Sequence, residues 1–257
     1  MATDALLPAR GSVDVSPSWL AIEAAFGGYV LSIAAGAVER LAPDLTPLSI
    51  TAEFLGSVRP GPLETVTEYI HAGRQSATAR VSLEQGHPKA VALAKLLRLT
   101  PDSPDALGVG TRIDTAALPD PETLGRREMS YGRLPWEDQV ELRLFDEPLD
   151  PTRAVRGWVR LTGDEPSDST SAFSRAPLLL DPLPSGLYGR QPYPANVPTV
   201  EITMHAAPVH IHTGEWHFVT QQTRWASADA AIEDSTLHDR AGAFVAVVRQ
   251  TRRIVRS

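Results

Sequence analysis

The feature that most constrains this chain is an internal duplication. Two stretches, residues 47–99 and 198–255, show the same order of patterns. Each begins with a proline and a strand-like run, turns at a glycine, continues with a second strand-like run and ends with two strands around a short turn. The offset is 198 − 47 = 151 at the start and, if Leu97 is matched with Gln250, 250 − 97 = 153 near the end. Similarity at a long, nearly constant offset predicts a duplicated domain.

Composition agrees with two small domains that share one core. The chain has 257 residues, 42% of them hydrophobic, and no cysteine. The absence of cysteine excludes disulfides and thiolate zinc sites and suits a reducing cytoplasm. No apolar run approaches the roughly 20 residues that span a bilayer, and residues 1–10 lack the pattern of a signal peptide. We therefore expect a soluble, cytoplasmic protein without a membrane span.

The charge pattern argues against nucleic acid as a partner. The net charge is −7, whereas affinity for phosphates requires clustered Lys and Arg. One basic cluster stands near the end of the chain and comprises Arg249, Arg252, Arg253 and Arg256. We expect these side chains to form the solvated end of a strand.

The first unit predicts one long helix and an antiparallel sheet. After Ser18, the stretch 19–42 is rich in Ala, Leu, Ile and Val and has no proline, which favours a helix that ends before Pro43. Five strands are expected, at 12–15, 48–55, 63–71, 77–85 and 90–99. A helix wrapped by such a sheet is the hotdog arrangement, so the duplication predicts an α+β double hotdog with merged sheets.

The second unit repeats this plan with a weaker helix. Its first strands are expected at 140–145 and 155–161, but the segment equivalent to the helix, 177–191, holds three prolines and two glycines. The second helix is therefore expected to be short, to be kinked, or to begin later in its unit than the first helix does. Asp181 is expected to be its N-cap, with Pro182 at the first helical position. The expected domains are 1–110, 111–135 as an interdomain crossing, and 136–257.

Several segments, taken in order, resemble the double-hotdog acyl-CoA thioesterase family of the thioesterase II type. They are FGGYV from Phe26, LTPLSITAEFLGSVRPGP from Leu45, GWVRL from Gly157, LLLDPLP from Leu178, PTVEITMH from Pro198, GEW from Gly214 and the last strand with Gln250. The resemblance implies hydrolysis of a fatty acyl-CoA thioester to the free acid and CoA. It implies acyl-CoA as the partner and no cofactor, no metal and no covalent enzyme intermediate.

The resemblance also implies a catalytic set of three residues. They are Asp181 within LLLDPLP, Thr199 within PTVE and Gln250 within VVRQT. A carboxylate can orient and deprotonate a water, while a hydroxyl and an amide can hold the other hydrogen bonds of that water. Each residue also has a structural explanation. Asp181 could simply cap a helix, Thr199 has ordinary strand propensity, and Gln250 could be a buried amide that needs partners.

Other site patterns are weaker. His210 and His212 could share one strand face as a metal pair does, but an exposed strand or turn explains them as well, so we assign no metal site. No GxSxG motif is present, which excludes the α/β-hydrolase route to the same reaction. A second function stays open, namely a non-hydrolytic acyl-CoA or acyl-carrier binding protein. Unpaired sheet edges favour a homo-oligomer.

Overall fold

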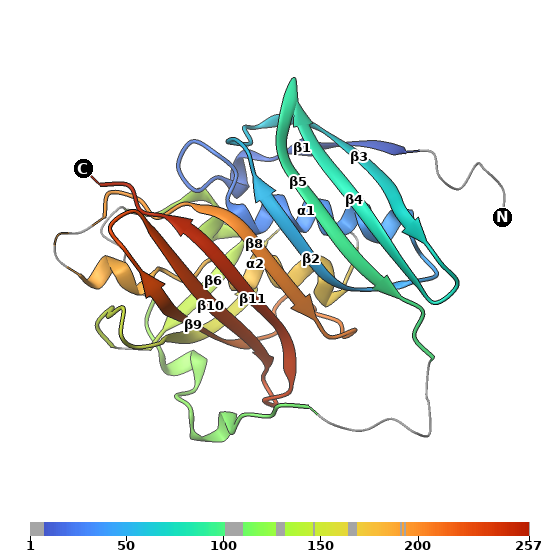
Figure 1. Ribbon diagram of the computed structural model, residues 1–257. Coiled ribbons are helices and arrows are strands. Elements are labelled where there is room, and N and C mark those ends of the chain that lie inside the picture. The colour runs from blue at the N-terminus through green and yellow to red at the C-terminus, as the bar shows by residue number, and fades with distance from the viewer. Residues whose placement is uncertain are drawn as a thin grey trace.

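The structure, a computed structural model, describes residues 8–100, 110–126, 132–145, 147–163, 169–190, 192 and 194–256. Residues 1–7 and 101–109 of the expected first unit, and 127–131 of the expected crossing, lie outside this part of the chain. All strands of the described residues join one sheet with antiparallel neighbours. Both α-helices lie on the same face of that sheet (Figure 1).

The elements follow the order expected from the sequence. The first half contains β1 (Ala9–Val15), the 3-10 helix η2 (Pro17–Trp19), α1 (Gly27–Leu41), β2 (Thr46–Phe54), β3 (Gly61–Ala72), β4 (Ser76–Gln85) and β5 (His87–Leu97). Three short 3-10 helices follow, η3 (Thr115–Ala117), η4 (Pro121–Thr123) and η5 (Pro135–Asp138). The second half contains β6 (Val140–Leu144), β7 (Val155–Leu161), α2 (Ala172–Leu180), η6 (Gly186–Gly189), β8 (Thr199–Ala206), β9 (His217–Ala226), β10 (Ala230–Asp239) and β11 (Phe244–Arg253).

The strand order shows how the two halves join. It is β1-β3-β4-β5-β2 for the first half, continued by β8-β11-β10-β9-β7-β6 for the second. Counted outward from the junction, β2 corresponds to β8, β5 to β11, β4 to β10, β3 to β9 and β1 to β7, while β6 is an additional edge strand. At the junction Thr51 lies opposite Thr203, and their hydroxyl oxygens are 3.0 Å apart. The expected double-hotdog fold is confirmed.

The strand registers show which residues of the two halves are equivalent. The junction sets an offset of 203 − 51 = 152 between β2 and β8, so Ile50 corresponds to Ile202. Ile50 pairs with Ala94 on β5, and Ile202 pairs with Gln250 on β11. The counterpart of Gln250 is therefore Ala94, at an offset of 250 − 94 = 156, and the match of Gln250 with Leu97 is wrong.

A difference in loop length explains this correction. The connection between β2 and β3 covers residues 55–60, whereas the connection between β8 and β9 covers residues 207–216. The offset is 152 on β8 and 233 − 79 = 154 on β10, after the longer loop. It reaches 156 on β11, after a second longer connection, residues 240–243 between β10 and β11 against Gly86 alone between β4 and β5. Counting along the sequence cannot locate such an insertion, because the strands on either side of it have similar patterns.

Helix α1 is buried on all sides for most of its length. Every residue from Gly28 to Val38 is buried, as expected for a helix that packs on a sheet and is covered on its other side. Trp19 stacks on Tyr29 with ring centroids 5.0 Å apart, and Phe26 stacks on Trp136 at 5.7 Å. These aromatic pairs hold the first turn of α1 in place.

The helix begins later than the sequence predicts. Its expected start at Trp19 is wrong, because the chain makes other hydrogen bonds before Gly27. The Phe26 N–H donates to the Trp19 carbonyl at 3.1 Å, and the Ala25 N–H donates to the Val58 carbonyl at 2.8 Å. Phe26 is the N-cap and offers no side-chain acceptor to the first turn.

The second helix is short, as predicted, but it begins earlier than predicted. Helix α2 has nine residues, starts after the N-cap Ser171 and contains Pro177. Asp181 is the C-cap of α2, so its expected role as an N-cap with Pro182 at the first helical position is wrong. The prolines after Asp181 do not begin a helix but follow the end of one, where a missing N–H costs least.

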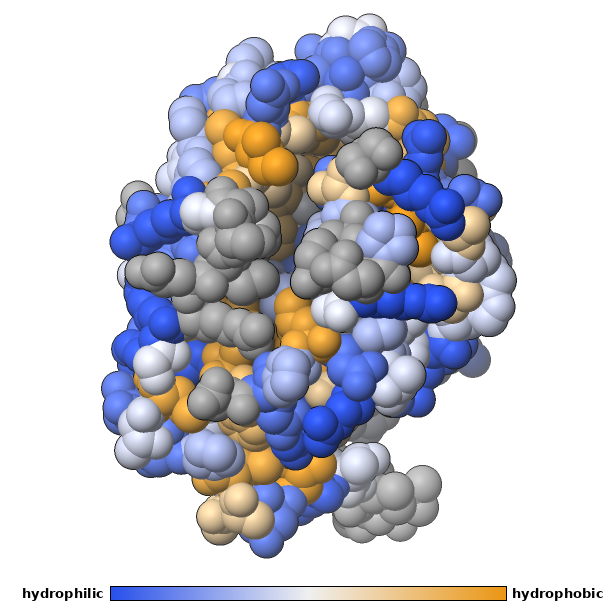
Figure 2. Space-filling view, turned by 90° about the vertical axis from the view of Figure 1, so that its left-hand side faces the viewer, coloured by the Kyte–Doolittle hydropathy of each residue, from blue (hydrophilic) through white to orange (hydrophobic). Residues whose placement is uncertain are grey.

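The described helices are too short for a membrane span, and the surface is mixed. Helix α1, the longer of the two, has 15 residues, and none of the described helices is long and apolar enough to cross a bilayer. On the side shown in Figure 2, polar residues divide the apolar surface into separate patches. The apolar core lies instead between the helices and the sheet.

The contact between α1 and α2 requires a glycine. A Cβ at Gly28 would lie 2.3 Å from the Pro177 carbonyl oxygen, and 3.0 Å from Cβ of Asp181. A backbone atom cannot move aside as the end of a side chain can. The first turn of α1 thus meets the last turn of α2 only because residue 28 has no side chain.

We predict that Gly28→Ala weakens this contact. The added methyl forces the helices apart, so the free energy of unfolding in urea should fall by roughly 1–3 kcal/mol. Gly56→Ala is the control, because the nearest atom to its new Cβ, Cδ of Lys89, is 3.6 Å away. Equal stabilities of the two variants would contradict the prediction.

Candidate active site

Thr199 and Gln250 lie side by side on neighbouring strands. Thr199 begins β8 and Gln250 is near the end of β11, where its side chain is fully buried. The Thr199 hydroxyl donates to Oε1 of Gln250 at 2.6 Å. This hydrogen bond orients the amide, and its Nε2 has no hydrogen-bond partner among the described residues. Strand alternation places Gln250 inward with Ala246 and Val248, as the sequence suggested.

Asp181 reaches the site from the end of α2. Its Oδ2 accepts a hydrogen bond of 2.8 Å from the Gly28 N–H, in the first turn of α1. The carboxylate thereby caps a helix of the other half, where Phe26 offers no side-chain acceptor. Its second oxygen, Oδ1, accepts no hydrogen bond from the described residues and lies 3.7 Å from Nη2 of Arg252.

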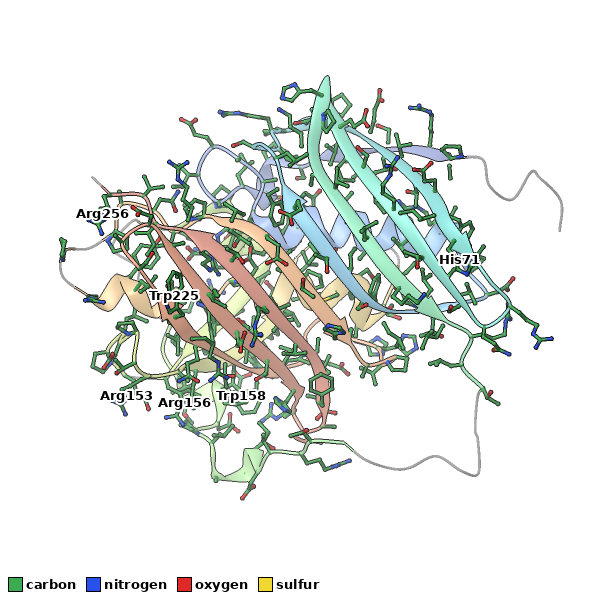
Figure 3. All side chains as sticks on the ribbon, viewed as in Figure 1. His71, Arg153, Arg156, Trp158, Trp225 and Arg256 are labelled. Atoms are coloured by element: carbon green, nitrogen blue, oxygen red, sulfur yellow. The ribbon has the colours of Figure 1, made fainter. Side chains whose placement is uncertain are left out.

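Arg252 is the main residue that the sequence interpretation missed. Arg249, Arg253 and Arg256 are exposed as expected, and Arg256 lies beside the C-terminus (Figure 3). Arg252 is buried, so its assignment to a solvated patch is wrong. The signal that could have found it is strand alternation, because residue 252 shares the inward face with Gln250.

A buried carboxylate holds Arg252 from the neighbouring strand. Oε2 of Glu233, on β10, lies 2.7 Å from Nε of Arg252, and Nη1 of Arg252 donates to the Val197 carbonyl at 3.2 Å. Oε1 of Glu233 accepts hydrogen bonds from Ser185 at 2.6 Å and from Thr223 at 2.9 Å. Because Ser185 follows shortly after Asp181, this network fixes the chain beyond α2 to the sheet.

The three predicted residues therefore surround one arginine. Arg252 lies opposite Thr199 in the strand register and two positions beyond Gln250. In the described part of the chain, Asp181 contacts this group through Arg252, and no hydrogen bond joins Asp181 to Thr199 or Gln250. Thr199 and Gln250 are in direct contact, and Asp181 approaches them from the helix side.

Tyr188 shows that the groups beside Arg252 are partly removed from water. It lies on η6, near Arg252 and Glu233. Burial raises the pKa of the Tyr188 hydroxyl, while a backbone hydrogen bond with Val197 and the positive charge of Arg252 act in the opposite direction. Charges in such a setting are poorly screened by water, so small shifts in position have large electrostatic effects.

The duplication supplies an internal comparison for this site. Strand registers give four of the polar residues a counterpart in the first half. The pairs are Thr199 with Pro47, Gln250 with Ala94, Arg252 with Leu96 and Glu233 with Ala79. All four counterparts are apolar, although they occupy the same places in the same fold. The fold itself therefore does not require the polar residues.

A cavity lies between the two halves. A cavity of about 870 Å³ opens near the C-terminal end of α1 and the start of α2. Its lining includes Pro47, the counterpart of Thr199, together with Ala42 and Phe173. It therefore occupies the place related to the polar site by the duplication, but its polar lining is a different one that includes Glu39, Arg40 and His210.

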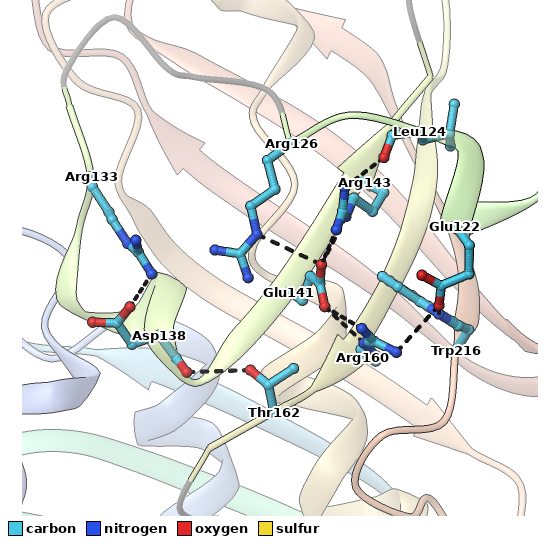
Figure 4. Close-up of polar contacts among 10 residues, drawn as sticks. All are labelled: Glu122, Leu124, Arg126, Arg133, Asp138, Glu141, Arg143, Arg160, Thr162 and Trp216. Atoms are coloured by element: carbon cyan, nitrogen blue, oxygen red, sulfur yellow. Dashed lines mark hydrogen bonds and ion pairs between the residues drawn. The ribbon is translucent and has the colours of Figure 1, made fainter.

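A second buried carboxylate lies elsewhere, at the edge of the sheet (Figure 4). Glu141 on β6 accepts hydrogen bonds from Nε of Arg143 and Nε of Arg160, both at 2.8 Å, and Arg126 lies 3.6 Å away. Burial alone would raise the pKa of Glu141, but the hydrogen bonds and charges of the two arginines outweigh it and lower the pKa. Arg160 also lies over the Trp216 ring at 4.2 Å. We interpret this cluster as structural, because it ties the crossing segment to β6 and β7.

The histidines do not form a metal centre. Rings of His210 and His212 are stacked at 6.3 Å and both residues are exposed. Among the described residues, no group of three or more His, Asp or Glu is placed to hold a metal ion.

Two family models match this chain. A family model described as the acyl-CoA thioesterase N-terminal domain matches residues 15–97, and one described as the acyl-CoA thioesterase C-terminal domain matches residues 113–254. Together they cover most of the chain. No curated protein sequence matches.

Solved structures show the same fold at low sequence identity. An acyl-CoA thioesterase II, TesB2, from Mycobacterium marinum has a TM-score of 0.70 at 18% identity, covering 97% of this chain and 93% of that chain. The tesB protein of Mycobacterium avium subs paratuberculosis has a TM-score of 0.71 at 17% identity, covering 99% and 95%. A hot dog fold protein of unknown function from Alicyclobacillus acidocaldarius has a TM-score of 0.77 at 17% identity, covering 96% and 94%.

The internal comparison predicts that Gln250 can be truncated at little cost to stability. Because Ala94 fills the equivalent place, Gln250→Ala should lower the free energy of unfolding by less than about 2 kcal/mol, and it also removes the unpaired Nε2. The control is Met204→Ala, a buried apolar truncation on β8 that should cost about 2–5 kcal/mol. Urea unfolding measures both, and an equal loss in the two variants would argue for a structural role of Gln250.

Proposed function

The chain belongs to the acyl-CoA thioesterase family, and on that premise we propose that Asp181, Thr199 and Gln250 hold the water that hydrolyses a fatty acyl-CoA thioester. The products are the free acid and CoA. The three residues come from α2, β8 and β11, and α1 of the other half contributes its N-terminal turn.

One observation supports this role most strongly, the unpaired Nε2 of Gln250. A buried donor without a partner costs about 1–3 kcal/mol, so such a group calls for a water or a ligand. Asp181 Oδ1, which accepts no hydrogen bond from the described residues, is the matching acceptor. A water between them could accept from Gln250 and donate to Asp181.

The reaction follows from these two contacts. The water oxygen attacks the thioester carbonyl carbon while Asp181 Oδ1 accepts a proton. The C–S bond then breaks, and the sulfur of CoA leaves and takes up a proton from Asp181. The positive end of the α1 dipole, beside Gly28, favours the negative charge that develops on the carbonyl oxygen.

Thr199 acts by orienting the amide. Its hydroxyl donates to Oε1 of Gln250, which keeps Nε2 directed into the site. If the amide turned over, Nε2 would face Thr199 and the water would lose a donor. Thr199 thus matters for geometry rather than for proton transfer.

A binding protein without hydrolytic activity would have no use for this set. The first half shows that an apolar core fits the same positions, with Pro47, Ala94 and Leu96. Release of free thiol from acyl-CoAs of several chain lengths, followed with a thiol-reactive dye, separates the two functions. No thiol release from any chain length would favour the binding function.

Location and assembly complete the proposal. We place the protein in the cytoplasm, where acyl-CoA is available and a chain without cysteine needs no oxidising environment. The edge strands β1 and β6 leave unpaired backbone groups that another copy can cover, which favours a homo-oligomer. Light scattering that finds only monomers at micromolar concentration would contradict the latter.

We predict that Asp181→Asn separates the capping role of this residue from its catalytic role. The Asn oxygen can still accept from the Gly28 N–H, so stability should change little. It cannot accept a proton, so turnover of acyl-CoA should fall by roughly 10²- to 10⁴-fold. The control is Asp234→Asn, at a carboxylate that pairs with Arg249 and Arg224. Hydrolysis by Asp181→Asn at the wild-type rate would show that Asp181 is structural.

A further inference from the structure

We propose that Arg252 and Glu233 are positioning residues that act together through Asp181, Arg252 by steadying its carboxylate and Glu233 by limiting the positive charge that Asp181 experiences. The proposal deepens the function given above and rests on it. It adds two residues that neither touch the reacting atoms nor belong to the trio.

The first argument is distance. Nη2 of Arg252 lies 3.7 Å from Oδ1 of Asp181, which is close enough for attraction but too far for a hydrogen bond. The guanidinium therefore steadies the carboxylate without occupying the lone pair that a water needs. Nε of Arg252 is held 2.7 Å from Oε2 of Glu233, so Glu233 keeps the guanidinium at this distance.

The second argument is burial. The exposed fractions of the side chains are 0% for Glu233, 9% for Arg252 and 8% for Asp181. Burying an ion pair is costly, and an apolar pair of similar size is often at least as stable. A chain that keeps such a pair next to a candidate site keeps it for a reason other than stability.

The duplication shows that the fold has an apolar solution at these positions. Leu96 stands in the place of Arg252, and Ala79 stands in the place of Glu233. Both are fully buried. The first half thus builds the same strands without any charge, and the ion pair occurs only in the half that carries the trio.

The third argument is the balance of charge around Asp181. The groups that face it or its partner are Arg252 from β11, Glu233 from β10 and the Tyr188 hydroxyl from η6, while the first turn of α1 has no acidic residue. Arg252 alone would hold the carboxylate in its charged form and weaken it as a base. Glu233, 2.7 Å from Nε of Arg252, offsets part of that charge.

The test uses the full chain and follows kcat and KM against pH with an acyl-CoA that the wild type hydrolyses. Glu233→Gln removes the negative charge but keeps the size and hydrogen-bonding ability of the side chain. The double variant Glu233→Ala with Arg252→Leu copies the first half and removes both charges of the pair together. Arg252→Lys keeps the charge and serves as the conservative rescue.

The control is the double variant Asp234→Ala with Arg249→Leu, which removes an ion pair of 2.7 Å from the exposed side of the same strands.

The proposal expects shifts in opposite directions. For Glu233→Gln the acid limb of the pH profile of kcat should move down by about one pH unit, because Asp181 then feels more positive charge. For the Glu233→Ala, Arg252→Leu variant it should move up by about one unit, and kcat should fall about tenfold or more at an unchanged KM. Arg252→Lys should keep the limb near its wild-type position, and the control should match the wild type.

Two outcomes would overturn the proposal. One is an unchanged acid limb in both Glu233→Gln and the apolar double variant. The other is a loss of kcat in both without opposite shifts, as a merely structural role would give. If instead the wild type releases no thiol, or Asp181→Asn is as active as the wild type, the proposed function itself fails. A proposal that fails while Asp181→Asn remains inactive leaves that function intact.

Discussion

The pairing of β2 with β8 is the constraint on which the rest of the structure depends. It merges two sheets into one, with Thr51 and Thr203 opposite each other at the junction. Because the sheet is continuous, α1 and α2 share one face and the first turn of α1 meets the last turn of α2 (Figure 1). The candidate site lies at this meeting point. Neither half could form it alone, since the carboxylate belongs to one half and the N–H that it caps belongs to the other.

The two halves carry different kinds of residue at equivalent positions. The first half uses alanine, leucine and proline where the second half uses a buried polar network. Since both halves form the same strands, the apolar residues are sufficient for folding, and the polar ones are free to serve chemistry. The cavity beside Pro47 is lined by other polar residues, among them Glu39, Arg40 and His210. A duplicated fold can thus carry different residues at its two related sites.

Burying the polar network costs free energy, but the network fixes the position of Asp181. A buried carboxylate and a buried guanidinium lose their hydrogen bonds to water, and contacts with neighbouring residues must replace them. For Glu233 these contacts come from Ser185, Thr223 and Arg252. The contact with Ser185 links the chain after Asp181 to the sheet. The close approach of Gly28 to Pro177 sets the distance between the helices. Asp181 is thus held by a backbone N–H on one side and faces a guanidinium on the other.

The sequence by itself determined the periodic features of this protein. Its repeat, its strands and the inward face of Gln250 all follow from patterns within a few residues, because backbone geometry alternates locally. Tertiary structure decided what depends on distant segments. Longer connections in the second half, before β9 and before β11, changed the counterpart of Gln250 in the first half. The end of α2 turned Asp181 from the expected N-cap of its own helix into the cap of another. Burial of Arg252 depended on Glu233 and Asp181, which approach from other elements and share no local pattern with it. Charged side chains are usually exposed unless they are paired, and only the folded chain places the pairing residues beside them.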